Sequence, residues 1–137
     1  MNLNEDLEQH STGQYGFTGT RLDDLTTFGG YTLVNIVVDR SGSVDPFSRD
    51  LEKVIQAAVL ACRDAPRADS LLIRITTFND QLTEHHGFKL LQNINPGDYD
   101  GFLRCGGGTA LFDASDESVQ CMLDYAGTLY GKDYTCN

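Results

Sequence analysis

The sequence predicts an α/β fold, in which helices cover a sheet that contains parallel strands. Two short runs rich in apolar and β-branched residues, 33–38 and 71–78, have the composition of strands buried on both faces. An amphipathic stretch with helical spacing lies between the two runs, and a second one follows a glycine-rich segment at 106–108. Strands and helices that alternate in this way are typical of α/β domains.

Length, composition and net charge exclude several classes of protein. A chain of 137 residues has the size of one domain, and its apolar content of 40% is enough for a hydrophobic core. The formal net charge of −10 repels nucleic acids and anionic membranes and attracts cations, so we expect no nucleic-acid or membrane binding. The first residues do not resemble a signal peptide, and no apolar run is long enough to span a membrane. We therefore expect a cytoplasmic protein.

Residues 1–29 are polar and rich in Gly and Thr, and we expect an irregular N-terminal arm there, ahead of a domain at 30–137. Some apolar side chains of the arm would allow it to pack on the domain: Tyr15, Phe17, Leu22, Leu25 and Phe28. A short hairpin, a packed arm and a tail without fixed structure remain alternative predictions.

The first predicted strand, 33–38, stops abruptly at the polar segment 39–43. Ligands of open α/β sheets bind beyond the carboxyl ends of such strands. Asp39, Ser41 and Ser43 carry oxygen atoms at alternate positions, which can converge on one point if the loop curls, with Gly42 free to adopt an unusual φ. Oxygen ligands suit a hard divalent cation, and Mg²⁺ or Mn²⁺ fits best.

A helix is predicted after Asp45-Pro46, because an N-cap residue followed by proline is a common helix start. Ala65-Pro66 should end it. Its apolar residues at helical spacing predict the face that covers the sheet: Phe47, Leu51, Val54, Ile55, Ala58 and Cys62. Its polar residues predict the opposite face: Arg49, Glu52, Lys53 and Gln56.

The second predicted strand, 71–78, should lie beside the first and ends at Asn79-Asp80. Asp80 is either a turn residue or an acceptor that supports the metal ligands. A weaker third strand is predicted at 87–91. His85 and His86 precede it, but neighbouring residues of a strand point to opposite faces and do not easily share one ion.

The four scattered cysteines have no zinc-site spacing, and we expect them to be reduced.

A last helix is predicted over residues 110–129, after a glycine-rich segment that lets the backbone approach the first loop. Its expected buried residues are Phe112, Val119, Met122, Ala126 and Leu129 or Tyr130. Acidic residues favour its first turns through the helix dipole: Asp113, Asp116 and Glu117. Asp113 lies four residues after Thr109, and it either only compensates the dipole or also orients the metal ligands.

Two segments together resemble the von Willebrand factor type A (VWA) domain with its metal-ion-dependent adhesion site (MIDAS). Residues 39–43 match the Asp-x-Ser-x-Ser motif, and residues 107–109 match the Gly-Gly-Thr segment that supplies a threonine ligand before a helix. The resemblance covers residues 31–137 and implies a doubly wound, Rossmann-like sheet flanked by helices. It implies four ligands of Mg²⁺ or Mn²⁺: Asp39, Ser41, Ser43 and Thr109. Asp80 and Asp113 would support these ligands without binding the ion themselves.

The chain departs from the family pattern near residue 132, where the family begins its next strand. The last ligand of the family, an aspartate in a Thr-Asp-Gly segment, has no counterpart here. We therefore expect residues 30–137 to be the N-terminal portion of a VWA-like domain that is incomplete at its C-terminus, as a truncated product, an engineered fragment or a piece completed by another chain.

In such a portion, strand 33–38 would be an exposed edge. It would be covered by the arm, by the terminal segment 134–136, by a second copy of the chain or by the missing C-terminal half. We expect association, because the arm is glycine-rich and the terminal segment is short.

The resemblance implies a non-enzymatic protein-binding module, in which a partner's Asp or Glu carboxylate completes the coordination of the metal. Intracellular members often serve as adaptors of AAA+ ATPases, and that branch is expected here. One alternative is an enzyme in which residues 106–109 cradle a phosphate while Asp39 holds Mg²⁺. However, no Gly-Lys-Thr/Ser loop occurs. The other alternative is a remnant that binds no metal.

Overall fold

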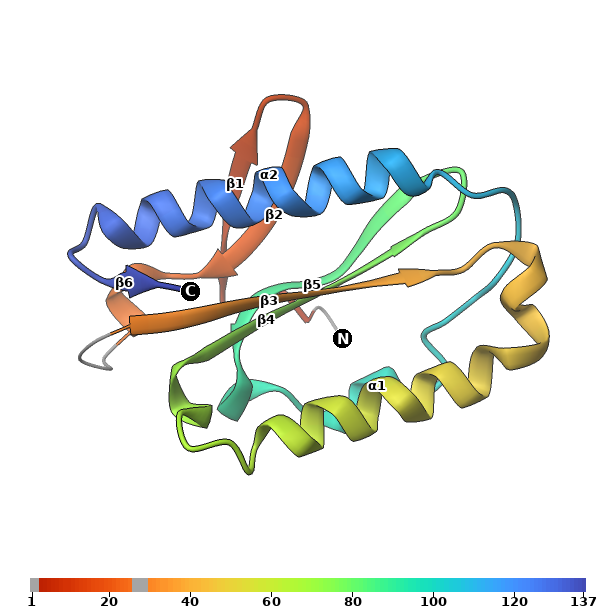
Figure 1. The fold of residues 1–137 in the computed structure, drawn as a ribbon, viewed down its shortest axis with the longest axis horizontal. Helices are drawn as coiled ribbons and strands as arrows, with labels where there is room; N and C mark the ends of the chain where they lie inside the picture. The colour runs from red at the N-terminus through yellow and green to blue at the C-terminus, as the bar shows by residue number, and fades with distance from the viewer. Residues whose placement is uncertain (1–2, 26–29) are drawn as a thin grey trace.

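The computed structural model describes residues 3–25 and 30–137. Within these residues, six strands form one sheet in the order β1-β2-β5-β4-β3-β6, and two long helices lie on opposite sides of its central strands (Figure 1). The elements are β1 (Leu7–Thr12), β2 (Tyr15–Thr20), β3 (Gly30–Asp39), α1 (Ser48–Cys62), β4 (Leu71–Phe78), β5 (Leu82–Leu90), α2 (Leu111–Tyr130) and β6 (Thr135–Cys136). This curled sheet between helices confirms the predicted α/β, Rossmann-like fold class.

The centre of the sheet is the parallel pair β3 and β4, which run in register from Thr32 opposite Leu71 to Asp39 opposite Phe78. The predicted second strand and its position beside the first are therefore confirmed. The third strand is longer than predicted, because β5 starts at Leu82 and pairs antiparallel with β4. Its first half was missed because Glu84 and His86 interrupt the apolar pattern, although each has a polar partner in the interior.

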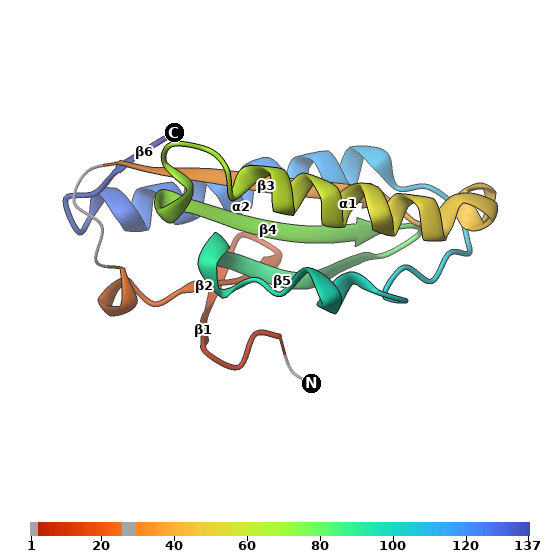
Figure 2. The ribbon, with the colours of Figure 1, turned by 90° about the horizontal axis from the view of Figure 1, so that it is seen from below.

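Residues 7–20 of the predicted arm are ordered strands. β1 and β2 form an antiparallel hairpin, and β2 joins β5 in parallel at Gly19 opposite Phe88 (Figure 2). A Cβ atom on Gly87 would overlap the backbone of Thr18, so this close approach of the strands requires glycine. Of the alternatives for the arm, the hairpin is the observed one, while Phe28 and the rest of 26–29 lie outside the described residues.

Helix α1 has a different buried face from the one predicted. The turn Gly42–Phe47 is a 3₁₀ helix that contains Pro46, and α1 begins after it. The buried residues are Ser48, Glu52, Ile55 and Val59. Ile55 was predicted correctly, whereas Phe47 is 60% and Val54 is 62% exposed, and Ala58 is exposed as well. The prediction for Glu52 was wrong because its carboxylate accepts hydrogen bonds from the N–H groups of Gly101 and Leu103.

Helix α2 lies within one residue of the predicted range, and its predicted buried face was correct at Leu129 but wrong at Phe112 and Val119. The buried residues are Ala114, Glu117, Cys121, Tyr125 and Leu129. Met122 and Ala126 are half-buried against this core, whereas Phe112 is 88% and Val119 is 53% exposed. The helix turns this way because Glu117 pairs with Arg74 of the sheet and the hydroxyl of Tyr125 donates to the carbonyl oxygen of Thr20.

The terminal segment covers only the start of β3. β6 pairs in parallel with β3 at Gly30 and Tyr31, and the N–H of Leu33 donates to the carbonyl oxygen of Asn137 over 2.8 Å. This is the local pairing that was one alternative for the edge, while the hairpin β1–β2 lies at the opposite edge of the sheet. From residue 34 to 39, the outer side of β3 has no strand partner in the described part of the chain. No helix of that part is long and apolar enough to cross a bilayer.

Candidate metal centre

Two loops that are far apart in the sequence meet at the carboxyl ends of β3 and β4. The N–H of Gly42 donates to the carbonyl oxygen of Gly107 over 3.1 Å, and the N–H of Gly106 donates to that of Arg40 over 2.9 Å. The N–H of Arg40 also donates to the carbonyl oxygen of Phe78 over 2.8 Å, which ties the first loop to β4. The Asp-x-Ser-x-Ser loop therefore lies beside the glycine-rich segment.

Asn79 and Asp80, which follow β4, hold the glycine-rich segment in place. The side-chain amide of Asn79 donates to the carbonyl oxygen of Gly106 over 2.9 Å, and Asp80 accepts from the N–H of Gly108 over 3.0 Å. Gly107 has φ +75°, and a Cβ atom there would lie 2.6 Å from a carboxylate oxygen of Asp80. This packing allows only glycine at position 107.

Three of the four predicted ligands share the first loop. Asp39 Oδ1 accepts from the N–H of Ser41 over 2.8 Å, and the hydroxyl oxygens of Ser41 and Ser43 are 3.2 Å apart. Thr109 is exposed in the second loop, where its side chain makes no hydrogen bond within the described residues. The guanidinium of Arg40 donates to Thr83 over 3.1 Å and forms no ion pair with Asp39 within the described residues.

Asp80 and Asp113, the two residues that were predicted to support the metal ligands, lie in different surroundings. Asp80 contacts the glycine-rich segment directly, as described above. Asp113 is exposed on the first turn of α2, where its charge reaches the hairpin. The hydrogen bond that Tyr15 donates to Asp116 over 2.7 Å raises the pKa of the Tyr15 hydroxyl, and the charge of Asp113 adds to the effect.

The described residues contain no group of three or more His, Cys, Asp or Glu side chains that could hold a metal ion. The predicted set has one carboxylate and three hydroxyl groups, so it belongs to a different kind of site. His85 and His86 do not form a metal pair: His86 bonds Tyr99 Oη over 2.7 Å and the carbonyl oxygen of Gly87 over 2.9 Å.

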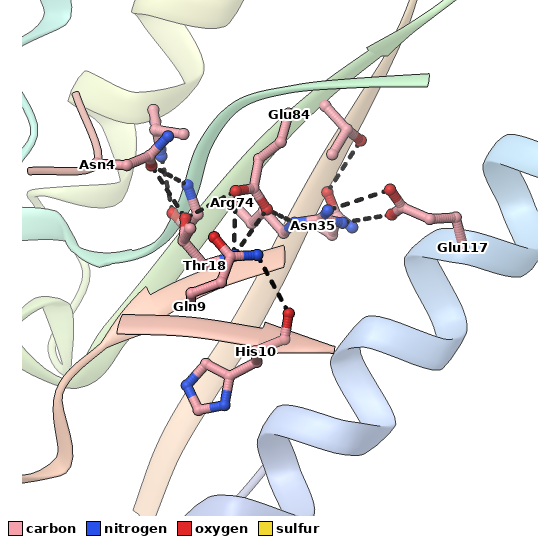
Figure 3. A network of polar contacts seen from close by, with 11 residues as sticks. Asn4, Gln9, His10, Thr18, Asn35, Arg74, Glu84 and Glu117 are labelled. Atoms are coloured by element: carbon pink, nitrogen blue, oxygen red, sulfur yellow. Dashed lines mark hydrogen bonds and ion pairs between the residues drawn. The ribbon is translucent and has the colours of Figure 1, made fainter. Parts of the chain in front are cut away.

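A buried ion network that the sequence did not predict lies beneath α2 (Figure 3). Arg74 of β4 is 0% exposed, and its guanidinium donates to Glu84 over 2.6 Å and to Glu117. Burial opposes the positive charge, but the two carboxylates outweigh burial and raise the pKa of Arg74. Glu84 also accepts from the N–H of Thr18 over 3.1 Å, so the network connects α2, the central sheet and the hairpin. The sequence signal for this network was Arg74, a single arginine within an apolar strand.

No protein-family model and no curated protein sequence matches the chain. Three solved structures of proximal thread matrix protein 1 from the mussel byssus are similar, with TM-scores of 0.53, 0.53 and 0.51 and identities of 21%, 21% and 22%. Each match covers 66% of this chain but only 24–25% of the mussel protein, so the chain spans about a quarter of that protein's length. At this identity the likeness shows the fold alone.

The mussel protein is a VWA-domain protein, and one of its structures holds zinc in the MIDAS motif. The structural similarity therefore agrees with the fold that the two sequence motifs implied.

Proposed function

We propose that this chain is a VWA-type binding module that holds a divalent cation beyond the ends of β3 and β4. The proposed ligands are Asp39, Ser41, Ser43 and Thr109. The observation that supports this proposal is the pair of backbone hydrogen bonds between the first loop and the glycine-rich segment, made by Gly42 and Gly106. These bonds join the two halves of the motif, which the sequence separates by a helix and two strands.

The donor atoms suit a hard cation. Carboxylate and hydroxyl oxygens are ligands that Mg²⁺ and Mn²⁺ prefer, whereas zinc favours nitrogen and sulfur. We therefore propose Mg²⁺ or Mn²⁺, although the MIDAS motif of the mussel protein holds zinc in one structure. When bound, the cation would supply an electrophilic centre for a carboxylate. The serine and threonine hydroxyls add no negative charge, so Asp39 alone would offset the charge of the ion.

The partner in this proposal is a protein that presents an Asp or Glu side chain. We infer a cytoplasmic adaptor role, with AAA+ ATPase systems as the expected class of partner. The net charge of −10 supports a protein partner over nucleic acid or an anionic membrane. The open side of β3 further supports contact with a second copy or with a completing segment.

An enzyme that transfers phosphate is less well supported. Such a site needs free backbone N–H groups in the glycine-rich segment. Here the N–H groups of Gly106, Gly108 and Ala110 already donate to Arg40, Asp80 and Asn79. We therefore propose a binding module without catalytic activity.

Calorimetric titration with MgCl₂ and MnCl₂ tests the proposal. The unmodified chain should bind one ion, and Asp39→Ala should abolish millimolar-or-better binding because it removes the only carboxylate of the set. Asp64→Ala is the matched control, since Asp64 is an exposed aspartate after α1. Unchanged Mn²⁺ binding by Asp39→Ala would contradict the site. A parallel titration with ATP and Mg²⁺ should show no binding beyond that of Mg²⁺ alone.

A further inference from the structure

The outer edge of β3 presents backbone hydrogen-bonding groups beyond the short pairing with β6. The N–H of Asn137 donates to the carbonyl oxygen of Tyr31, and the N–H of Leu33 donates to that of Asn137, each over 2.8 Å. The odd-numbered residues of β3 therefore point their backbone groups toward this edge. Three of them have no strand partner there within residues 3–25 and 30–137: Asn35, Val37 and Asp39.

Helix α1 carries an apolar flank on the side of this edge. Its other flank faces the segment that follows β5, because Gln56 donates to the carbonyl oxygen of Pro96 over 3.1 Å and Arg63 to that of Ile94 over 2.7 Å. Since the strands are ordered β5-β4-β3, the opposite flank of α1 faces the open side of β3. The residues of this flank recur at helical spacing, are exposed and carry no charge: Phe47, Val54, Ala58 and Ala61.

Helix α2, on the other face of the sheet, is arranged in the same way. Asp116 accepts a hydrogen bond from Tyr15 over 2.7 Å, so that flank of α2 faces the hairpin. The opposite flank lies toward the open edge, because the hydroxyl of Tyr130 donates to the carbonyl oxygen of Cys136 in β6 over 3.2 Å. Figure 2 shows both helices beside β3 at this edge of the sheet. This flank of α2 is also uncharged: Phe112, Ser115, Val119 and Ala126.

Residues 34–38 of β3 and the two helix flanks form one uncharged surface that runs through all three layers, and we call it the edge surface. Exposed apolar surfaces of this kind mark sites of protein contact. The exposed side chains of the edge surface offer on the order of 600 Å² per copy, so a symmetric pair would bury about 1,200 Å², enough for a specific interface.

We propose that the edge surface binds a second copy of the chain, related by a two-fold axis that passes near Val37 and perpendicular to the sheet. The two β3 strands would pair antiparallel, so that the same backbone groups donate and accept on both sides. Each layer then meets its own counterpart, β3 on β3, α1 on α1 and α2 on α2. Although each chain has a net charge of −10, no like charges of residues 34–38 or of the helix flanks would meet.

The position of α1 over the sheet fits this arrangement. Ile55 and Val59 of α1 share a core cluster with Val38 of β3 and Ile73 of β4, so the helix lies over these two strands. If two β3 strands pair about 5 Å apart, α1 and its symmetry mate come to about 10 Å, the distance at which helices pack. Small alanine side chains at the contact suit such an approach. The interface goes beyond the proposed metal centre and does not depend on it.

Sedimentation of the full chain in buffer with EDTA tests the interface apart from any metal. We expect a dimer at about 100 μM that dissociates on dilution. Val54→Glu should raise the dissociation constant of the dimer at least about tenfold, because the two-fold axis places two unpaired carboxylates in the contact. Leu60→Glu is the matched control and should leave the constant unchanged, since Leu60 is exposed on the same helix but lies on the flank of Gln56.

Cross-linking tests the two-fold axis. A short bismaleimide should link two Ala58→Cys chains into a covalent dimer, because a residue near the axis meets its own copy. Leu60→Cys and the unmodified chain, which has four cysteines of its own, give the background. Circular dichroism of each variant verifies that it is folded.

Two results would overturn the interface: a chain that stays monomeric at about 100 μM, or equal dissociation constants for Val54→Glu and Leu60→Glu. Equal cross-linking of Ala58→Cys and Leu60→Cys would refute the two-fold arrangement.

Discussion

The N–H of Gly42 and the carbonyl oxygen of Gly107 form a 3.1 Å hydrogen bond that joins the two halves of the candidate metal centre. Gly107 can make it because its φ of +75° turns the carbonyl toward the first loop while its missing side chain leaves room for Asp80. The geometry of the centre therefore depends on a glycine that carries no ligand.

Gly107→Ala should weaken binding of Mn²⁺ and destabilise the fold by about 1–3 kcal/mol, through strain at positive φ and overlap with Asp80. Urea unfolding and a Mn²⁺ titration measure the two effects. Gly106→Ala is the matched control, because an added Cβ atom at Gly106 meets nothing within 4 Å and its φ is not positive. Equal behaviour of the two variants would contradict the described loop.

The ion network below α2 gives a second prediction. Glu117→Ala should destabilise the fold by about 3 kcal/mol, because it leaves Arg74 buried with Glu84 as its remaining partner. Gln120→Ala, at an exposed position of the same helix, should cost less than about 0.5 kcal/mol. Urea unfolding compares the two variants, and a similar small effect of both would show that the Arg74–Glu117 pair contributes little.

The sequence predicted the central strands of the fold better than the buried faces of the helices. Strand β4 is buried on both faces, and β3 packs against one core cluster on each face, so their apolar composition identified them. The faces of the helices were harder, because Glu52 and Glu117 point inward toward hydrogen-bond donors that lie far away in the sequence. A pattern of apolar and polar residues cannot reveal such partners, and it assigned the exposed Phe112 to the core.

The candidate site was predicted to a similar extent. Asp39, Ser41 and Ser43 lie on one loop, as their spacing indicated. The support by Asn79 depends on where β4 ends relative to the glycine-rich segment. This position is a consequence of strand pairing, so no local motif predicts it.

Stability should fall in mild acid because of His86. Burial lowers the pKa of His86 to about 4, and the ring bonds Tyr99, so the folded chain keeps it neutral. The unfolded chain takes up a proton near pH 6.5, and it therefore binds more protons than the folded chain between pH 6.5 and 4. The free energy of unfolding should decrease as the pH falls through this window, by about 3 kcal/mol at most.

Urea unfolding at several pH values measures this slope. His86→Gln cannot titrate, so it should have a shallower slope whatever its absolute stability. His85 has a lowered pKa as well, and it leaves a residual slope of the same sign in the variant. If the unmodified chain and His86→Gln lose stability in parallel between pH 6.5 and 4, His86 is not the source of the acid sensitivity.

The open side of β3 predicts self-association. Residues 34–38 are apolar apart from Asn35, and beyond Leu33 no strand of the described chain pairs with this side. Soluble proteins seldom leave such a β-branched edge unprotected, and a second copy can add its own β3 to continue the sheet. Sedimentation at about 100 μM should therefore detect a dimer or larger species that dissociates on dilution.

Val37→Lys should shift this equilibrium toward the monomer, because a lysine on an edge strand opposes pairing with an identical chain. Lys53→Asp is the control for a change of charge on the surface of α1, and it should leave association unchanged. Hydrogen exchange adds a second measurement: the outward N–H groups of residues 34–38 should be protected in the associated chain and exchange rapidly after dilution. A chain that stays monomeric at about 100 μM, with these groups unprotected, would show that the edge remains open in solution.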